Sequence, residues 1–125
     1  MADATETIAA LRQAVQQFVD ERDWRQFHTP KNLSMSLAIE AAELMEHFQW
    51  LDVPASVAYS RDPAHRSQIA DEMADVCCYL LSLANAIDLD LSMAVRDKLV
   101  KNAHNYPADL CRGKFEKRNL PSGDS

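Results

Sequence analysis

Four acidic side chains have the types and spacing that could support chemistry in this sequence. Glu40 and Glu43 stand three residues apart, and Glu72 and Asp75 repeat that spacing further along the chain. Residues three apart share one face of a helix. Carboxylate oxygens are hard ligands, and no Cys or His clusters with them, so the set favours Mg²⁺ or Mn²⁺ over zinc or copper.

The two acidic pairs lack neighbouring basic residues. No Lys or Arg occurs between Lys31 and Arg61, or between Arg66 and Arg96. A solvated acidic helix face normally carries salt bridges at i, i+4, and these segments offer none. Two carboxylates about 5 Å apart at an effective dielectric near 20 repel by roughly 3 kcal/mol, so converging pairs would need a cation between them. A divalent-metal site is the favoured interpretation, and a solvated acidic face is the alternative.

A di-iron helical bundle also uses carboxylates that face inward. That site requires Glu-x-x-His on two helices. His47 stands four residues after Glu43 and one after Glu46, so the required spacing is missing.

Helices are the elements that must position these acids, because four segments show helical periodicity and none shows a sustained strand alternation. The fold class is therefore predicted to be all-α. The first helix is expected to begin near Asp3, with Glu6 completing a capping box, and to end near Trp24. The second is expected to begin after Asn32 or Ser34 and to close near Trp50.

Two further helices are expected after a connector that contains Pro54 and Ser60. Asp62 is the predicted cap of a long third helix, with Pro63 at its first position. Asp90 is the predicted cap of a fourth helix, which ends before Pro107.

Apolar residues at helical spacing predict which side of each acid-bearing helix is buried. These residues form an apolar stripe along each helix, and each acid directly precedes one of them. Both acidic pairs therefore lie on the same flank of their stripes. Packing of the two helices could bring all four carboxylates into one cleft. The stripes are Leu37, Ala41, Leu44 and Phe48 in the second helix, and Ile69, Met73, Val76, Leu80, Leu83 and Ile87 in the third.

The length and composition of the chain predict its domain organisation. Its 125 residues, 47% hydrophobic and 26% charged, suit one globular domain. We expect a helical catalytic domain over residues 1–107 and a partly mobile tail over residues 108–125, where Gly, Pro and Ser gather. The two glycines, Gly113 and Gly123, both follow residue 110, which excludes a Gly-rich phosphate loop.

The charge and the cysteine content of the chain limit the classes of binding partner and the cellular compartment that we expect. A net charge of −6 disfavours binding to nucleic acid. The three cysteines have no zinc-site spacing and fit reduced thiols in a cytoplasmic protein. The longest apolar run, from Val76 to Leu81, is too short to span a membrane. We therefore expect a cytoplasmic protein with neither a nucleic-acid nor a membrane partner.

Two stretches of the sequence resemble a known family. The segment from Leu37 to Glu46, followed by the segment from Ala70 to Val76, resembles the EExxE and later ExxD signature of MazG-like nucleotide pyrophosphohydrolases. Within that superfamily the chain is similar to the dCTP pyrophosphatase branch over about residues 8–118. Further residues that carry this similarity are Arg22 to Leu33, Phe48 to Trp50, Lys98, Asn102, Tyr106 and Pro107.

The resemblance implies a fold, an assembly and an activity. It implies a bundle of four to five helices assembled as a homo-oligomer, for which we expect a tetramer rather than a dimer, with sites at subunit contacts. It implies hydrolysis of a nucleoside triphosphate, dCTP or a modified dCTP, to the monophosphate and pyrophosphate, which would clear such nucleotides from the pool. Mg²⁺, with Mn²⁺ as the alternative ion, would be held by the catalytic residues Glu40, Glu43, Glu72 and Asp75.

The resemblance also implies substrate-binding residues outside the acidic set. Trp24, His28 and Trp50 are expected at the base, with Tyr106 as a further aromatic contact. Lys98 and Asn102, four residues apart on one helix face, are expected at the triphosphate. Two alternative functions are a pyrophosphatase of broader nucleotide specificity and a non-catalytic helical adaptor whose acidic face binds a basic partner.

Overall fold

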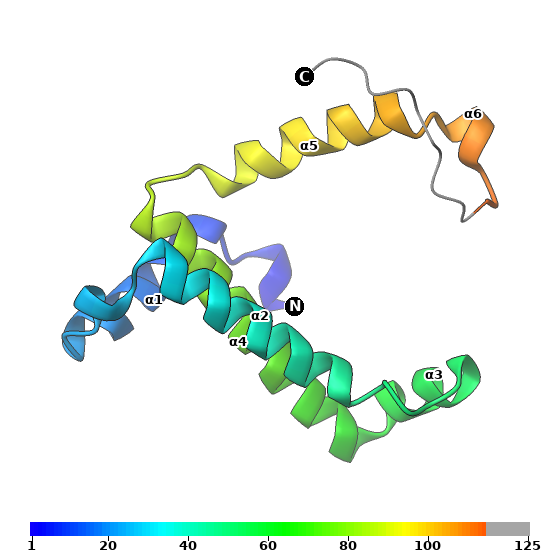
Figure 1. The fold of residues 1–125 in the computed structure, drawn as a ribbon, viewed down its shortest axis with the longest axis horizontal. Coiled ribbons are helices and arrows are strands. Elements are labelled where there is room, and N and C mark those ends of the chain that lie inside the picture. Colours follow the sequence, from blue (N-terminus) through cyan, green and yellow to red (C-terminus); the bar gives the residue numbers. More distant parts are fainter. Residues whose placement is uncertain (115–125) are drawn as a thin grey trace. The chain divides into compact units, whose positions relative to one another are not determined.

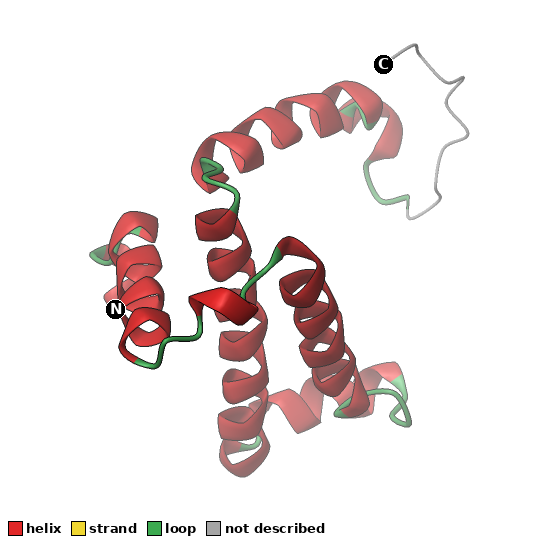
Figure 2. Cartoon of the chain, turned by 60° about the vertical axis from the view of Figure 1, so that its left-hand side comes forward, coloured by secondary structure: helices red, strands yellow, loops and turns green. Residues whose placement is uncertain are grey.

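The protein is described here from a computed structural model in which residues 1–114 are placed. Over these residues the regular structure is entirely helical (Figure 2). This confirms the all-α class. The α-helices are α1 (Ile8–Glu21), α2 (Pro30–Glu46), α3 (Val53–Arg61), α4 (Pro63–Ala86), α5 (Leu91–Asn105) and α6 (Ala108–Cys111), with 3-10 helices η1 (Ala2–Ala4) and η2 (Arg25–Phe27).

The chain divides into two compact units. The first runs from Met1 to Leu89 and contains α1 to α4, and the second begins at Asp90 and contains α5 and α6. The expected mobility of the tail remains a prediction, and its residues 115–125 lie outside the described part of the chain. Among residues 1–114, no single helix is both long enough and apolar enough to cross a membrane, and α4 and α5 meet that test only when taken together.

Two predicted helix starts are confirmed by their caps. The Asp62 side chain accepts a hydrogen bond from the Ala64 amide at 3.0 Å, and Pro63 follows in the first helical turn. The Asp90 side chain accepts from the Met93 amide at 2.9 Å. Both caps satisfy amides that have no partner inside the helix.

The predicted limits of the first helix were wrong. The residues around Asp3 form only the short η1, and α1 begins at Ile8 because the Thr7 hydroxyl accepts a hydrogen bond from the Ala10 amide at 3.0 Å. The helix ends at Glu21 rather than near Trp24. Asp23 adopts a positive φ of 53°, a left-handed conformation that a right-handed helix cannot continue through.

The second helix begins earlier and ends earlier than expected. Thr29 caps α2 through a 3.3 Å hydrogen bond from the Asn32 amide, and Pro30 occupies the first turn, where its missing N–H is not needed. The helix closes at Glu46 rather than near Trp50. The expected connector contains α3, which Asp52 caps by accepting from the Ala55 amide at 2.8 Å.

Helices α2 and α4 lie side by side and antiparallel, and they form the centre of the first unit (Figure 1). The predicted stripes are confirmed at most of their positions, including Leu37, Leu44, Ile69 and Val76. They are wrong at Ala41 and Met73, which are exposed, whereas Glu40 and Glu72 are half-buried. The residues of intermediate or low exposure recur at helical spacing, with Leu33, Leu37, Glu40, Leu44 and His47 on α2, and Ile69, Glu72, Val76, Tyr79 and Leu83 on α4. Two of the acids therefore belong to the contact itself.

Helix α1 is fixed to the C-terminal end of α4 by a polar clamp. The Arg12 guanidinium donates to the Asn85 side-chain oxygen at 2.9 Å and to the Leu89 carbonyl at 2.7 Å. The Asn85 amide donates in return to the Arg12 carbonyl at 3.1 Å. With Val19 buried on the same helix, this clamp sets the position of α1 against α4.

Candidate active site

Three of the predicted acids converge across the contact between α2 and α4. Glu40 and Glu43 come from α2 and Glu72 comes from α4, and each offers one carboxylate oxygen within 4.8 Å of the others. Glu40 and Glu43 on α2 lie at the same level of the antiparallel contact as Glu72 on α4. The structure thus brings together residues that lie far apart in the sequence.

The electrostatic state of this cluster is unfavourable without a cation. Oε2 of Glu40 and Oε2 of Glu72 are buried, and neither has a hydrogen-bond partner among residues 1–114. Burial, together with the neighbouring carboxylates Glu43, Asp75 and Glu72, raises the pKa of Glu40 to about 7. Burial and the charge of Glu43 also raise the pKa of Glu72. Both shifts report charge that the protein itself does not neutralise.

The donor set fits a hard divalent cation. None of the salt bridges among residues 1–114 involves the four predicted acids. Buried carboxylate oxygens without partners are the groups that a cation would satisfy. A ligand set of oxygens alone is typical of Mg²⁺ or Mn²⁺ rather than of zinc or copper.

Asp75 lies one helical turn beyond Glu72 on α4 and is not part of the three-residue set. Its negative charge still raises the pKa of Glu40 and of Glu72. Asp75 also lines a neighbouring cavity, so it stands between the acid cluster and that cavity. Its role as a fourth metal ligand stays a prediction.

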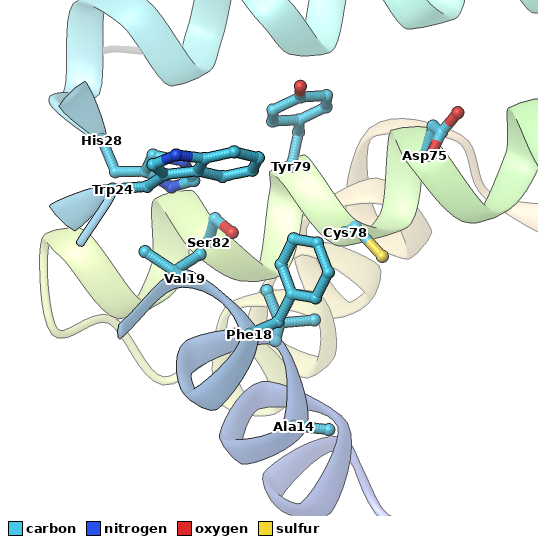
Figure 3. Close-up of a pocket in the computed structure, with 10 residues that line it drawn as sticks. Ala14, Phe18, Val19, Trp24, His28, Asp75, Cys78, Tyr79 and Ser82 are labelled. Carbon is cyan, nitrogen blue, oxygen red and sulfur yellow. The ribbon is translucent and has the colours of Figure 1, made fainter. Parts of the chain in front are cut away.

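The neighbouring cavity has a volume of about 430 Å³ and a largely apolar wall (Figure 3). Phe18 and Trp24 meet edge to face, with 5.8 Å between ring centroids. Trp24 and His28 lie at one end of the cavity and Asp75 at the other (Figure 3). The cavity is lined by Ala14, Val15, Phe18, Val19, Trp24, His28, Asp75, Cys78, Tyr79 and Ser82. Such a site suits a planar aromatic ligand.

Of the aromatic residues predicted at the base, only Trp24 and His28 line this cavity. Trp50 is 88% exposed and follows the C-terminal end of α2, whereas His28 precedes its N-terminal end. The 17 residues of α2 make that helix about 25 Å long. Within one chain, the structure does not bring Trp50 to the cavity.

The other predicted substrate residues belong to the second unit. Lys98 and Asn102 lie on α5, where Asn102 is half-buried. Tyr106 is the C-terminal cap residue of α5, and its amide donates to the Asn102 carbonyl at 2.7 Å. Their approach to the triphosphate stays a prediction.

Sequence reasoning did not assign several residues that line the cavity. Phe18 is 49% exposed, and its side chain lines the cavity. Tyr79 and Ser82 follow Asp75 by four and seven residues, which places them on its helix face and is the signal that could have identified them. Cys78 lies beside them, and partial burial, Cys77 and Asp75 raise the pKa of its thiol.

Comparison with known proteins gives consistent matches. The MazG-like family matches residues 35–116. The chain is 38% identical to dCTP pyrophosphatase 1 of Homo sapiens over 118 residues, which cover 94% of this chain and 69% of that protein. It is 39% identical to dCTP pyrophosphatase 1 of Bos taurus over 120 residues, covering 94% and 70%. The crystal structure of a pyrophosphatase from Archaeoglobus fulgidus superposes with a TM-score of 0.72 at 36% identity, covering 76% of this chain and 87% of that one.

Proposed function

The chain belongs to the MazG-like family, and we propose that it hydrolyses dCTP or a modified dCTP to the nucleoside monophosphate and pyrophosphate. The named activity of its relatives, dCTP pyrophosphatase 1, supports this assignment. The chain is a nucleoside triphosphate pyrophosphatase in this proposal, and the cytosine base is the part of the substrate that the aromatic cavity receives.

One observation in the structure carries the proposal. Glu40 and Glu72 each keep a buried oxygen that no described residue partners, within a cluster that adjoins the aromatic cavity. An adaptor that binds a basic partner through a solvated acidic face would leave those oxygens in water. A metal site beside a cavity for an aromatic base instead supplies a cation for the phosphates and a binding site for the base, and nucleotide hydrolysis requires both.

The proposed roles follow the position of each residue. Glu40, Glu43, Glu72 and Asp75 would hold one or two Mg²⁺ ions, which when bound neutralise phosphate charge and activate water. Trp24, His28 and Tyr79 hold the base by stacking and edge contacts, and the apolar wall from α1 excludes water from it. Lys98, Asn102 and Tyr106 are assigned to the triphosphate and the base through the family pattern.

The apolar surface of the first unit supports a homo-oligomer, with a tetramer as the expected form. A groove of about 670 Å³ between α2 and α4 is lined by Ala41, Met45, Phe48 and Met73, among others, and both methionines are 57% exposed. Exposed apolar grooves of this kind mark protein contacts. A second copy would also explain Trp50, which is exposed and does not line the aromatic cavity of its own chain. The free cysteines support a cytoplasmic location.

A direct assay tests the proposed activity. The protein is incubated with Mg²⁺ and each of the common nucleoside triphosphates, and the release of pyrophosphate and monophosphate is measured. We expect dCTP, or a cytosine-modified analogue, to be the preferred substrate. Glu43→Gln is expected to abolish turnover, and Glu21→Gln, an exposed acid near the end of α1, is the matched control with unchanged turnover. Release of inorganic phosphate alone, or of no product, would contradict the proposal.

A further inference from the structure

A second cavity adjoins the acid cluster at the end opposite the aromatic cavity. It has a volume of about 340 Å³ and is lined by Glu43, Glu46, His47, Tyr59 and Glu72. The two cavities reach the acids from different sides, because the aromatic cavity includes Asp75 and this one includes Glu43 and Glu72.

The order of these features along the two helices is fixed by their antiparallel packing. His28, before α2, and Ser82, near the end of α4, line the aromatic cavity. The acids Glu43 and Glu72 follow, and His47 comes one turn beyond Glu43, about 6 Å further along the helix axis. A nucleoside triphosphate has its base at one end and its terminal phosphates at the other. A base in the aromatic cavity therefore directs the terminal phosphates toward His47.

The His47 ring is held in place by Tyr59. Its Nδ1 lies 3.1 Å from the Tyr59 hydroxyl, and among residues 1–114 its Nε2 has no hydrogen bond. Tyr59 is itself fixed by the His65 ring, which stacks on it at 3.9 Å with 11° between the planes, and by Phe48 at 5.8 Å. When the Tyr59 hydroxyl donates to Nδ1, the imidazole proton resides on Nε2, which becomes a donor.

The chemistry of the cavity distinguishes His47 and Tyr59 from the rest of its lining. The other three side chains are carboxylates, which accept hydrogen bonds when ionised. Phosphate oxygens are acceptors as well, so a phosphate in this cavity needs donors. We propose that His47, positioned by Tyr59, donates a hydrogen bond to the terminal phosphates of the substrate and to the pyrophosphate product. This inference rests on the proposed function.

Calorimetric binding of the two products separately tests the inference. In excess Mg²⁺, His47→Leu is expected to weaken pyrophosphate binding about tenfold, the loss of one hydrogen bond to a charged group, and to leave dCMP binding unchanged. His47→Gln keeps an N–H donor and is expected to recover part of the pyrophosphate affinity. Tyr59→Phe removes the positioning hydroxyl and is expected to give a smaller loss than His47→Leu. Gln49→Leu, an exposed neighbour, is the control with both affinities unchanged.

Two outcomes would overturn the inference. One is an unchanged pyrophosphate affinity in His47→Leu, and the other is an equal loss of affinity for both products, which would indicate a merely structural role. The melting temperature of each variant establishes whether it is folded. If His47→Leu does not fold, His47→Gln and Tyr59→Phe are used to test the inference. Failure of the proposed function has a different signature, because wild-type protein would then release no pyrophosphate from any nucleotide.

Discussion

Glu40 on α2 and Glu72 on α4 meet across the contact between their helices, and each keeps one buried carboxylate oxygen that has no hydrogen-bond partner in the described part of the chain. A helix contact normally buries apolar side chains, since buried acids cost free energy unless they are paired. Here the protein keeps two buried acids, Glu40 and Glu72, that face each other beside the further carboxylates of Glu43 and Asp75. This pair of acids therefore suits the binding of a cation and does not by itself stabilise the helix contact.

Mg²⁺ is expected to stabilise the folded protein. An ion that binds only the folded state at about 100 times its Kd adds about 2.7 kcal/mol to the free energy of unfolding. The melting temperature in the presence of millimolar Mg²⁺, compared with that in EDTA, measures this effect. Glu40→Gln and Glu72→Gln should each remove most of the increase, whereas Glu21→Gln should retain it. An equal increase in all four proteins would show that the ion binds elsewhere.

The metal-free protein is expected to lose stability as the pH rises. Because the pKa of Glu40 is raised from 4.5 to about 7 in the folded state, the folded protein binds more protons than the unfolded protein between these values. Stability is therefore greatest near the lower value and falls as pH increases through the upper one. Melting temperatures in EDTA from pH 4.5 to pH 8 measure the slope. Glu40→Gln should flatten it, and a slope identical to that of the wild type would contradict the assignment.

Phe18 is expected to contribute to substrate affinity more than to folding. Its ring is half-exposed and meets Trp24 at 5.8 Å in the cavity wall. Loss of one aromatic contact of about 1 kcal/mol corresponds to a rise of several-fold in KM. Steady-state kinetics of Phe18→Ala with dCTP measure this rise. Phe27→Ala is the matched control, since Phe27 is 58% exposed and does not line the cavity, and its KM should equal that of the wild type.

Trp50 is expected to act in a site formed by two copies of the chain. Trp50→Ala and Glu43→Gln should each lose activity as pure proteins. Co-expression of the two variants with different tags and random assembly gives oligomers in which about a quarter of all sites combine an intact Glu43 with an intact Trp50 from another subunit, and selection for both tags raises that share. Recovery of activity in the doubly purified oligomer measures this complementation. Its absence, with mixed oligomers present, would assign Trp50 to its own chain.

Arg12 is expected to be a stability residue remote from the chemistry. Its guanidinium ties α1 to Asn85 and to the Leu89 carbonyl, and its loss would leave these acceptors without their partner. Arg12→Ala is expected to lower the free energy of unfolding by about 1–3 kcal/mol. Urea denaturation measures the change. Arg61→Ala, in the exposed last turn of α3, should change it by less than about 0.5 kcal/mol.

Local signals in the sequence were sufficient for several features of the protein. The i, i+3 spacing of two acidic pairs, without a neighbouring Lys or Arg, was enough to predict three residues that the structure brings together, Glu40, Glu43 and Glu72. Caps at Asp62 and Asp90 were also predictable, because capping depends on residues within one turn. Thr29 with Pro30 and Asp52 with Pro54 are cap signals of the same kind, and the expectation of a connector around Pro54 missed α3.

Only the tertiary structure decided which helix faces meet. The amphipathic patterns of α2 and α4 correctly predicted part of the contact, but they placed Ala41 and Met73 inside and the acids on a flank. In the structure Glu40 and Glu72 lie within the contact. Which residues at the edge of an apolar stripe are covered depends on how the two helices cross, and the periodicity of one helix does not encode this. The pairing of His47 with Tyr59, and the sharing of one cavity by α1 and α4, likewise depend on contacts between distant segments, which no local pattern encodes.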